Sequence, residues 1–433
     1  MKSARPLLLA LVLLLLPASA PALGAPSGDH GRSHAKVVGY FIEWGIYGRQ
    51  YFVKNVATSG SASRLDVINY AFANVAPDAS GNVVCQLADP WADYQRPVSA
   101  EESVDGKTVP ATDPLQGNFQ QLQALKALYP GLKVDISLGG FTFSKYFSQA
   151  AATQQGREQL VSSCIDMFIK GNIGAPGAAA GVFDGIDIDW EWPGSEGNAG
   201  NIISPADKQN NTLLLAEFRR QLDRYGKQTK HHYLLTQFLP AAPAKIDAGF
   251  EVNKIFHYLD FGTVQGYDLH GPWESTTNHQ SNIFTARGDP SSPRFSIDDT
   301  VRTYLRRGAP SEDLVIGVPF YSHGWTGVSP TNHGLFQPST AAAPGTWEAG
   351  SEDYKVAKTF LGSGFTRYED RRAGAAWLFD GTTFWTFDDP RVMTQKTRYV
   401  DDNDLGGIMF WELSGDTADG ELIHAISNGL AHD

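Results

Sequence analysis

The sequence predicts an α/β fold, namely a (β/α)8 TIM barrel with a small α+β insertion domain. Eight short apolar runs recur from residue 36 onward, and segments with the helical spacing of apolar residues separate most of them. Apolar strands that alternate with helices are typical of a parallel sheet covered by helices, and eight such units predict a closed barrel. A long aromatic connection between the last two runs predicts the insertion.

The predicted strands are the apolar runs, at residues 36–42, 66–73, 132–138, 182–190, 232–239, 261–267, 314–320 and 406–412. The predicted helices have apolar residues at helical spacing, at residues 114–129, 144–170, 204–227, 295–308, 390–403 and 419–431, with weaker segments after the first and fifth strands. Two connections are too long for simple turns. Residues 75–113 are rich in Asp, Pro and Ser, whereas residues 324–388 contain strand-like pieces at 376–379 and 383–387. We expect 324–388 to form an α+β wall beside the barrel mouth, interrupting a catalytic domain of residues 36–433.

The first 24 residues have the order of a secretory signal peptide. A basic start precedes an apolar run from Pro6 to Pro17, and small residues follow it. The apolar run is shorter than the roughly 20 residues of a membrane-spanning helix. We therefore expect residues 1–24 to be removed and the mature protein to be secreted, with no membrane partner. An uncleaved membrane anchor is the alternative.

Composition narrows the classes of partner. The 35 basic and 47 acidic side chains give a net charge of −12 without any basic cluster, which argues against nucleic acid or an anionic surface. Aromatic residues make up 12% of the chain, which permits a carbohydrate binder without indicating one. Cys85 and Cys164 are the only cysteines, and in an exported chain they can form one disulfide. Two buried free thiols are the alternative.

An acidic row is the most informative segment, and it reads FDGIDIDWEWP from Phe183 to Pro193. Alternate side chains of a strand share a face, so Asp187, Asp189 and Glu191 point one way and the residues between them point the other. In a barrel the apolar face packs against helices and the acidic face looks inward. Carboxylates about 6.6 Å apart repel one another and are costly to desolvate, so the row indicates function rather than stability.

Three interpretations of the acidic row are open. The carboxylates could solvate an exposed edge, although the flanking Ile and Trp residues argue for a buried strand. They could hold a hard cation such as magnesium or calcium. We favour general acid–base catalysis by a carboxyl whose pKa its neighbours raise, without metal or cofactor. Glu191 is the best-placed acid because it lies last on the strand, at the end where barrel enzymes carry their chemistry.

The octapeptide DGIDIDWE resembles the signature of glycoside hydrolase family 18, the chitinases and their relatives. Other segments match the family in chain order, and they are Gly39-Tyr40-Phe41 with Trp44, Asn69-Tyr70-Ala71-Phe72, Ser137-Leu138-Gly139-Gly140, Gln265-Gly266-Tyr267-Asp268 and Trp411. The resemblance runs from about residue 36 to the C-terminus. It implies a chitinase of the bacterial type, which carries an insertion after barrel strand seven.

The resemblance implies a retaining, substrate-assisted hydrolysis of β-1,4 linkages between N-acetylglucosamine units. Glu191 protonates the glycosidic oxygen while the acetamido oxygen of the substrate attacks the anomeric carbon. Water then opens the oxazolinium ion with Glu191 as base. Asp189 accepts the acetamido N–H, and Asp187 modulates Asp189 as one of a coupled pair. Tyr267 and Asp268 hold the acetamido oxygen and steady the reacting ring.

Further residues are implied as supports or substrate contacts. Ser137 and Tyr40 would hydrogen-bond to Asp187, although Ser137 can be a small residue at a strand end and Tyr40 a core residue. Gln265 would line the pocket, and Trp411 would form the sugar platform, with a core indole as the alternative. Five other indoles are candidates for the cleft, and they are Trp44, Trp91, Trp192, Trp273 and Trp325.

The chain departs from the family pattern in three places. Phe141-Thr142-Phe143-Ser144 stands where Trp-Thr-Trp-Ser is common, Trp192 replaces a frequent Tyr, and the segment YSHGW at 321–325 replaces YGRGW, which removes an arginine contact. These changes leave the acid in place and bear on subsite preference. We expect a secreted, monomeric chitinase that acts on chitin or chitooligosaccharides. The alternatives are an endo-β-N-acetylglucosaminidase acting on N-glycans and a catalytically silent chitin-binding lectin.

Overall fold

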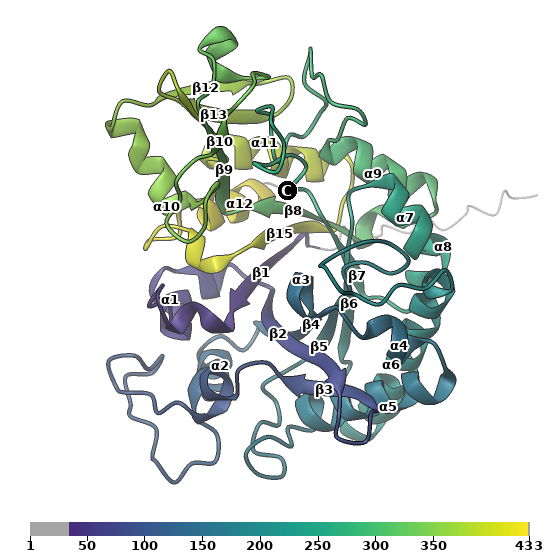
Figure 1. Cartoon of the computed structure of the whole chain (residues 1–433). Helices are drawn as coiled ribbons and strands as arrows, with labels where there is room; N and C mark the ends of the chain where they lie inside the picture. The colour runs from purple at the N-terminus through teal and green to yellow at the C-terminus, as the bar shows by residue number, and fades with distance from the viewer. Residues whose placement is uncertain (1–33, 432–433) are drawn as a thin grey trace, which may run out of the picture. The chain divides into compact units, whose positions relative to one another are not determined.

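Eight parallel strands form a closed barrel in the computed structural model, which describes residues 34–431 (Figure 1). In their order around the barrel they are β1 (Lys36–Ile42), β2 (Val67–Pro77), β4 (Lys133–Gly139), β5 (Gly185–Asp189), β6 (Leu234–Leu239), β7 (Phe261–Val264), β8 (Leu314–Pro319) and β15 (Gly407–Trp411). Pairing of β15 with β1 closes the ring. The predicted barrel is confirmed. The predicted signal peptide, residues 1–24, lies outside the described residues.

Helices surround the barrel strands in Figure 1. They are α1 (Val53–Thr58), α2 (Gly117–Leu128), α3 (Gly140–Phe143), α4 (Phe147–Ala151), α5 (Gln154–Cys164), α6 (Asp207–Thr229), α7 (Pro243–Gly249), α8 (Val252–Ile255), α9 (Ile297–Arg306), α10 (Tyr354–Ala357), α11 (Pro390–Asp402) and α12 (Glu421–Leu430). The single helix predicted at 144–170 is divided because Thr153 caps a new N-terminus, its side chain accepting the Gly156 N–H at 3.0 Å. No helix within residues 34–431 is both long enough and apolar enough to cross a membrane.

A hairpin that the sequence did not predict extends β2 beyond the barrel. Strand β3 (Val83–Leu87) pairs antiparallel with the end of β2. The turn between them is held by the Asp78 carboxylate, which accepts the backbone N–H groups of Ser80 and Asn82. Cys85 on β3 and Cys164 at the end of α5 form a disulfide with a Cα–Cα distance of 5.0 Å. The hairpin is therefore tied covalently to the helical layer.

A second, antiparallel sheet follows β8 directly. Its strands are β9 (Tyr321–Thr326), β10 (Ala341–Ala342), β11 (Ser351–Asp353), β12 (Thr366–Asp370), β13 (Ala375–Phe379) and β14 (Thr383–Thr386). In Figure 1 this sheet, in light green, lies beside the barrel with β9 next to β8. It has an apolar core of its own that includes Trp325, Trp377 and Phe384. The sheet and α10 form the expected α+β insertion.

Strand β5 shows the alternation that the sequence predicts. Ile186, Ile188 and Trp190 are buried on the outer side, where the Trp190 indole stacks on the Phe147 ring of α4 at 5.4 Å. On the inner side, the Asp187 carboxylate reaches across the barrel to the Tyr40 hydroxyl of β1. The acidic face therefore looks into the barrel, and the interpretation as an exposed edge is wrong.

Candidate active site

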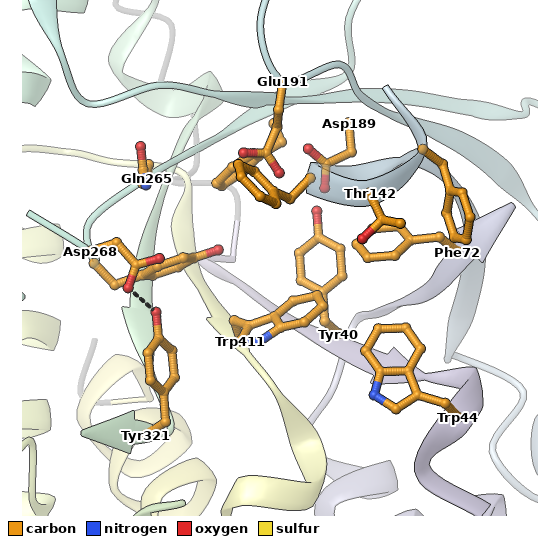
Figure 2. Close-up of a pocket in the computed structure, with 14 residues that line it drawn as sticks. Tyr40, Trp44, Phe72, Thr142, Asp189, Glu191, Gln265, Asp268, Tyr321 and Trp411 are labelled. Atoms are coloured by element: carbon orange, nitrogen blue, oxygen red, sulfur yellow. Dashed lines mark hydrogen bonds between the residues drawn. The ribbon is translucent and has the colours of Figure 1, made fainter. Parts of the chain in front are cut away.

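A pocket of about 300 Å³ opens where the barrel strands end (Figure 2). The residues that line it come from the ends of the strands and the loops after them, and they are Tyr40, Trp44, Phe72, Phe141, Thr142, Phe143, Asp189, Glu191, Phe238, Gln265, Tyr267, Asp268, Tyr321 and Trp411. Most of the expected site residues are among them. Barrel enzymes place their chemistry at this end of the strands.

Asp187 lies below the pocket and is held by three hydroxyl groups. Ser137 Oγ and the Tyr40 hydroxyl donate to its Oδ2 at 2.7 and 3.0 Å, and Thr236 Oγ1 donates to its Oδ1 at 2.6 Å. Ser137 and Thr236 can do so because the register aligns both with Asp187 on neighbouring strands. Burial raises the pKa of Asp187, and the three hydrogen bonds oppose that rise.

Asp189 and Glu191 carry the acidic row into the pocket, and Figure 2 shows their carboxyl groups above the Trp411 ring. Burial raises the pKa of Asp189 well above its usual range, and the neighbouring charges of Glu191 and Asp187 raise it further. Its Oδ1 is buried without a hydrogen-bond partner among residues 34–431. This oxygen can therefore accept a hydrogen bond from a ligand.

Glu191 is a carboxyl group that keeps its proton at neutral pH. Burial raises its pKa to about 8, the positive charge of Lys245 opposes the rise, and the negative charge of Asp268 adds to it. The backbone around Glu191 is fixed on both sides, because its N–H donates to Ser144 Oγ at 2.9 Å and its carbonyl accepts from Asn201 Nδ2 at 2.9 Å. A fixed, protonated carboxyl at the pocket wall suits a general acid.

Tyr267 and Asp268 follow β7 and face the same pocket. Burial and the nearby carboxylates raise the pKa of Tyr267 well above its usual range, so its phenol remains a hydrogen-bond donor. Asp268 adopts a left-handed backbone conformation with φ of 54°, and its Oδ1 accepts the Tyr321 hydroxyl at 2.5 Å. The side-chain oxygen of Gln265 is already engaged by the protein, because Oε1 accepts the Ala241 N–H at 3.3 Å.

Aromatic rings form the side of the pocket opposite the carboxyl groups. The Trp411 ring stacks on Phe72 at 5.7 Å and lies 5.2 Å from Tyr40 and 6.3 Å from Trp44. A continuous aromatic surface of this kind suits the apolar face of a sugar ring. Tyr40 therefore has two roles, because its ring supports the platform and its hydroxyl contacts Asp187.

Four of the candidate indoles do not line this pocket. Trp192 is buried against Phe238, with the ring centroids 5.5 Å apart, and the Lys245 ammonium lies over the Trp192 ring at 5.1 Å from its centroid. Trp325 is buried in the insertion core. Trp91 is exposed and does not line the pocket, and Trp273 is 62% exposed with its ring 5.1 Å from that of His323. Trp44 and Trp411 are the expected indoles that the structure brings together at the site.

The Asp-x-Asp spacing does not produce a metal-binding cluster among the described residues. Within residues 34–431 no group of three or more His, Cys, Asp and Glu side chains is arranged to hold a metal ion. Asp187 already accepts hydrogen bonds on both oxygens from protein hydroxyls. Acid–base chemistry fits this geometry better than the binding of a hard cation.

Residues 36–416 match the family model described as Glycosyl hydrolases family 18. The chain belongs to this family. It is 36% identical over 427 residues to Chitinase A1 of Niallia circulans, an alignment that covers 90% of this chain and 58% of that protein. The chain spans 58 to 60% of the length of the curated relatives that it matches at 36% identity.

Two solved structures extend the comparison. The catalytic domain of psychrophilic chitinase B from Arthrobacter TAD20 is 45% identical, with a TM-score of 0.87 and coverage of 92% of this chain and 96% of that chain. A family 18 N-acetylglucosaminidase from Paenibacillus barengoltzii is 31% identical, with a TM-score of 0.71 and coverage of 91% of this chain and 99% of that chain.

Several residues of this family 18 site escaped the sequence analysis. Thr236 supports Asp187, Ser144 holds the Glu191 backbone, and Tyr321 binds Asp268. Ser144 and Tyr321 belong to segments that the resemblance singled out, so their place in those segments could have identified them. Nothing in the sequence marks Thr236 as a site residue, because a threonine is an ordinary residue in a strand.

Proposed function

We propose that this family 18 hydrolase is a chitinase that cuts β-1,4 linkages between N-acetylglucosamine units with Glu191 as general acid and base. The observation that carries the proposal is the raised pKa of Glu191, about 8, at the wall of a pocket that also presents a sugar-sized aromatic surface. The names of the relatives agree with it. The substrate is chitin or chitooligosaccharides, and the enzyme acts as a monomer without a nucleic-acid partner.

The proposed reaction is substrate-assisted and proceeds with retention at the anomeric carbon. Glu191 gives its proton to the glycosidic oxygen, and the acetamido oxygen of the sugar forms the new bond to the anomeric carbon as the old bond breaks. Water then attacks the oxazolinium ion and loses its proton to the Glu191 carboxylate. The products are two saccharides, and the anomeric carbon at the new reducing end keeps its configuration. Glu191 is protonated again at the end of the cycle.

Asp189 and Tyr267 position the acetamido group in this proposal. The Asp189 Oδ1, which lacks a hydrogen-bond partner among the described residues, accepts the acetamido N–H. The Tyr267 hydroxyl, which lies 3.9 Å from the weakly accepting Met409 sulfur, donates to the acetamido oxygen. Asp187 shares a proton with Asp189, and its three hydroxyl donors stabilise the anionic form of the pair.

We also propose that the protein is secreted after removal of residues 1–24. The disulfide between Cys85 and Cys164 agrees with an oxidising destination. Expression of the full chain in a secreting host, followed by N-terminal sequencing of the exported protein, checks this. Protein that stays in the membrane with Met1 intact would contradict it.

Replacing Glu191 by Gln tests the assignment of the acid. We expect Glu191→Gln to lower kcat on chitooligosaccharides by about 100-fold or more while binding remains measurable. Glu196→Gln is the matched control, because Glu196 is exposed in the loop after β5 and does not line the pocket. A Glu191→Gln protein that hydrolyses as fast as this control would remove Glu191 as the acid.

A substrate with a free amine in place of the acetamido group at the cleavage subsite tests the nucleophile. It should resist cleavage, and cutting at a similar rate would point to Asp189 as a protein nucleophile. Product analysis separates the alternatives. Oligomers from chitin indicate a chitinase, monomers alone an N-acetylglucosaminidase, cleavage restricted to a high-mannose glycopeptide an N-glycan endoglycosidase, and binding without cleavage a lectin.

A further inference from the structure

Lys396 on α11 is a buried cation that the proposed reaction does not use. Its side chain is 0% exposed, and its ammonium pairs with the carboxylate of Asp388, which follows β14 at the end of the insertion. Nζ also donates to Ser281 Oγ at 2.5 Å, in the connection between β7 and α9. A buried ion pair is weak evidence for stability, because desolvation of both charges offsets much of their attraction. Its second contact, with Ser281, leads to the active site.

Ser281 connects this ion pair to the strand end that carries Tyr267. Its Oγ donates to the Gly266 carbonyl oxygen at 2.5 Å. An ammonium has three N–H donors and no acceptor, so Lys396 donates to Ser281 Oγ and leaves the serine hydrogen for another acceptor. The ion pair thereby directs the hydroxyl toward Gly266. No other hydrogen bond within residues 34–431 reaches the Gly266 carbonyl.

The Gly266 carbonyl belongs to the peptide group that carries the Tyr267 nitrogen. Because a peptide group is planar, a hydrogen bond to its oxygen also fixes the direction in which Tyr267 leaves the strand. Gly266 is held from the other side as well, since a Cβ added there would lie 2.2 Å from the Gly317 carbonyl oxygen. The backbone before Tyr267 is therefore held between Ser281 and the barrel strand β8.

The Tyr267 side chain depends on this backbone for its position. Its hydroxyl lies 3.9 Å from the Met409 sulfur, a weak acceptor, and no stronger acceptor among the described residues holds it. Its ring packs closely on β8, because a Cβ added at Gly317 would lie 2.8 Å from Tyr267 Cε1. Rotation of the peptide group before Tyr267 would therefore carry the hydroxyl with it.

We propose that Ser281 and Lys396 are positioning residues that act on Tyr267. Lys396, with Asp388 as its counter-charge, orients the Ser281 hydroxyl, and that hydroxyl fixes the peptide group before Tyr267. The inference rests on the proposed function, because it assigns the Tyr267 hydroxyl to the acetamido oxygen. Ser281, Lys396 and Asp388 do not line the pocket, so they act through the backbone rather than on the sugar.

Replacing Ser281 by Ala removes the hydrogen bond to Gly266 and keeps the ion pair. We expect kcat on a fluorogenic chitooligosaccharide to fall about tenfold, the size of effect that one hydrogen bond supports. Ser59→Ala is the matched control, because Ser59 is also buried and donates to a backbone carbonyl, that of Val56 at 3.3 Å, but lies outside the pocket lining. The control should keep kcat within about twofold of wild type.

A double-mutant cycle with Tyr267→Phe separates positioning from a merely structural role. Without the phenol hydroxyl nothing remains to be positioned, so Ser281→Ala should change kcat less than about twofold in this background. A structural role would lower kcat by the same factor in both backgrounds. If turnover of Tyr267→Phe falls below detection, the same cycle is measured in Glu191→Gln protein as affinity for a tetramer of N-acetylglucosamine, with the same pattern expected.

The part played by Lys396 is tested by removing both charges together. Lys396→Met combined with Asp388→Asn leaves no unpaired charge buried. Because the Ser281 hydroxyl then loses its fixed direction, kcat should fall about threefold. Adding Ser281→Ala should give the rate of Ser281→Ala alone, and factors that multiply would overturn the role of Lys396. Lys396→Gln is the second variant if the pair impairs folding, since its amide can accept the serine hydrogen and draw it away from Gly266.

The outcomes separate the two proposals. If wild type hydrolyses chitooligosaccharides and Glu191→Gln does not, the proposed function stands. A folded Ser281→Ala enzyme as fast as Ser59→Ala, or an equal loss in the Tyr267→Phe background, would then overturn the positioning role alone. If wild type binds the tetramer without cutting it, the proposed function fails and the affinity cycle decides the positioning role. Absence of binding would overturn both.

Discussion

Removal of the Thr236 hydroxyl should move the acidic limb of the pH profile of kcat/KM to higher pH. Thr236 Oγ1 donates to Asp187 Oδ1 at 2.6 Å, while Ser137 and Tyr40 both donate to Oδ2. Thr236→Val therefore leaves Oδ1 of a fully buried carboxylate without a donor. Burial already raises the pKa of Asp187, and the hydrogen bond from Thr236 is the first of the three that oppose this rise.

The size of the effect follows from the energy of the lost bond. A hydrogen bond to a charged group contributes about 1.5–3 kcal/mol, and about 1.4 kcal/mol corresponds to a tenfold change in a proton equilibrium. Loss of the bond disfavours the anion, so the Asp187–Asp189 pair should keep its second proton to a higher pH. The acidic limb of kcat/KM should therefore move upward by about one to two pH units.

The assay is kcat/KM on a fluorogenic chitooligosaccharide from about pH 3 to 9. Thr236→Ser keeps a hydroxyl and should restore the wild-type limb. Thr263→Val is the matched control, because Thr263 is equally buried on the neighbouring strand β7 but donates to the Gln237 carbonyl at 3.4 Å rather than to a carboxylate. A folded Thr236→Val enzyme with an unshifted limb, or an equal shift in Thr263→Val, would refute the reasoning.

Two further predictions concern stability. Burial lowers the pKa of His279 to about 4, and both of its ring nitrogens lack hydrogen-bond partners among the described residues. Only the unfolded chain binds a proton there between pH 6.5 and 4, so His279 should cost about 3 kcal/mol of stability as pH falls through that range. Denaturant unfolding at both pH values should show a smaller loss in His279→Leu, and an equal loss would contradict this. Replacing Cys85 and Cys164 together by Ser should lower the free energy of unfolding by about 2–4 kcal/mol, and unfolding at unchanged denaturant concentration would count against the bridge.

Local patterns were sufficient to predict the barrel and the acidic row. Strand β5 alternates carboxylate and apolar side chains, and because the side-chain period of a strand is two, the opposite orientations of Asp187 and Ile188 followed from the sequence. The hairpin partner β3 was missed, since its residues do not stand out from the polar connection around them. The break between α4 and α5 depended on a single capping residue, Thr153.

Long-range packing decided which side chains meet at the site. An indole exposed in the pocket and an indole buried beside it have the same local sequence signal, so Trp44 and Trp192 could not be told apart in advance. The contact of Thr236 with Asp187 depends on the register between β5 and β6, to which hydrogen bonds of the whole barrel contribute. The contact of His323 with Asp268 spans 55 residues and joins the insertion to the barrel.

The amino-acid sequence by itself determined the order of the eight barrel strands, the inward direction of the acidic row and the position of Glu191 close to the end of a barrel strand. These properties follow from the backbone geometry of a strand and from the hydrophobic effect, both of which act over a few residues. Only the tertiary structure decided the protonation of Glu191 and the neighbours of Asp187 and Asp268. Desolvation and hydrogen bonding depend on atoms that are close in space and distant along the chain.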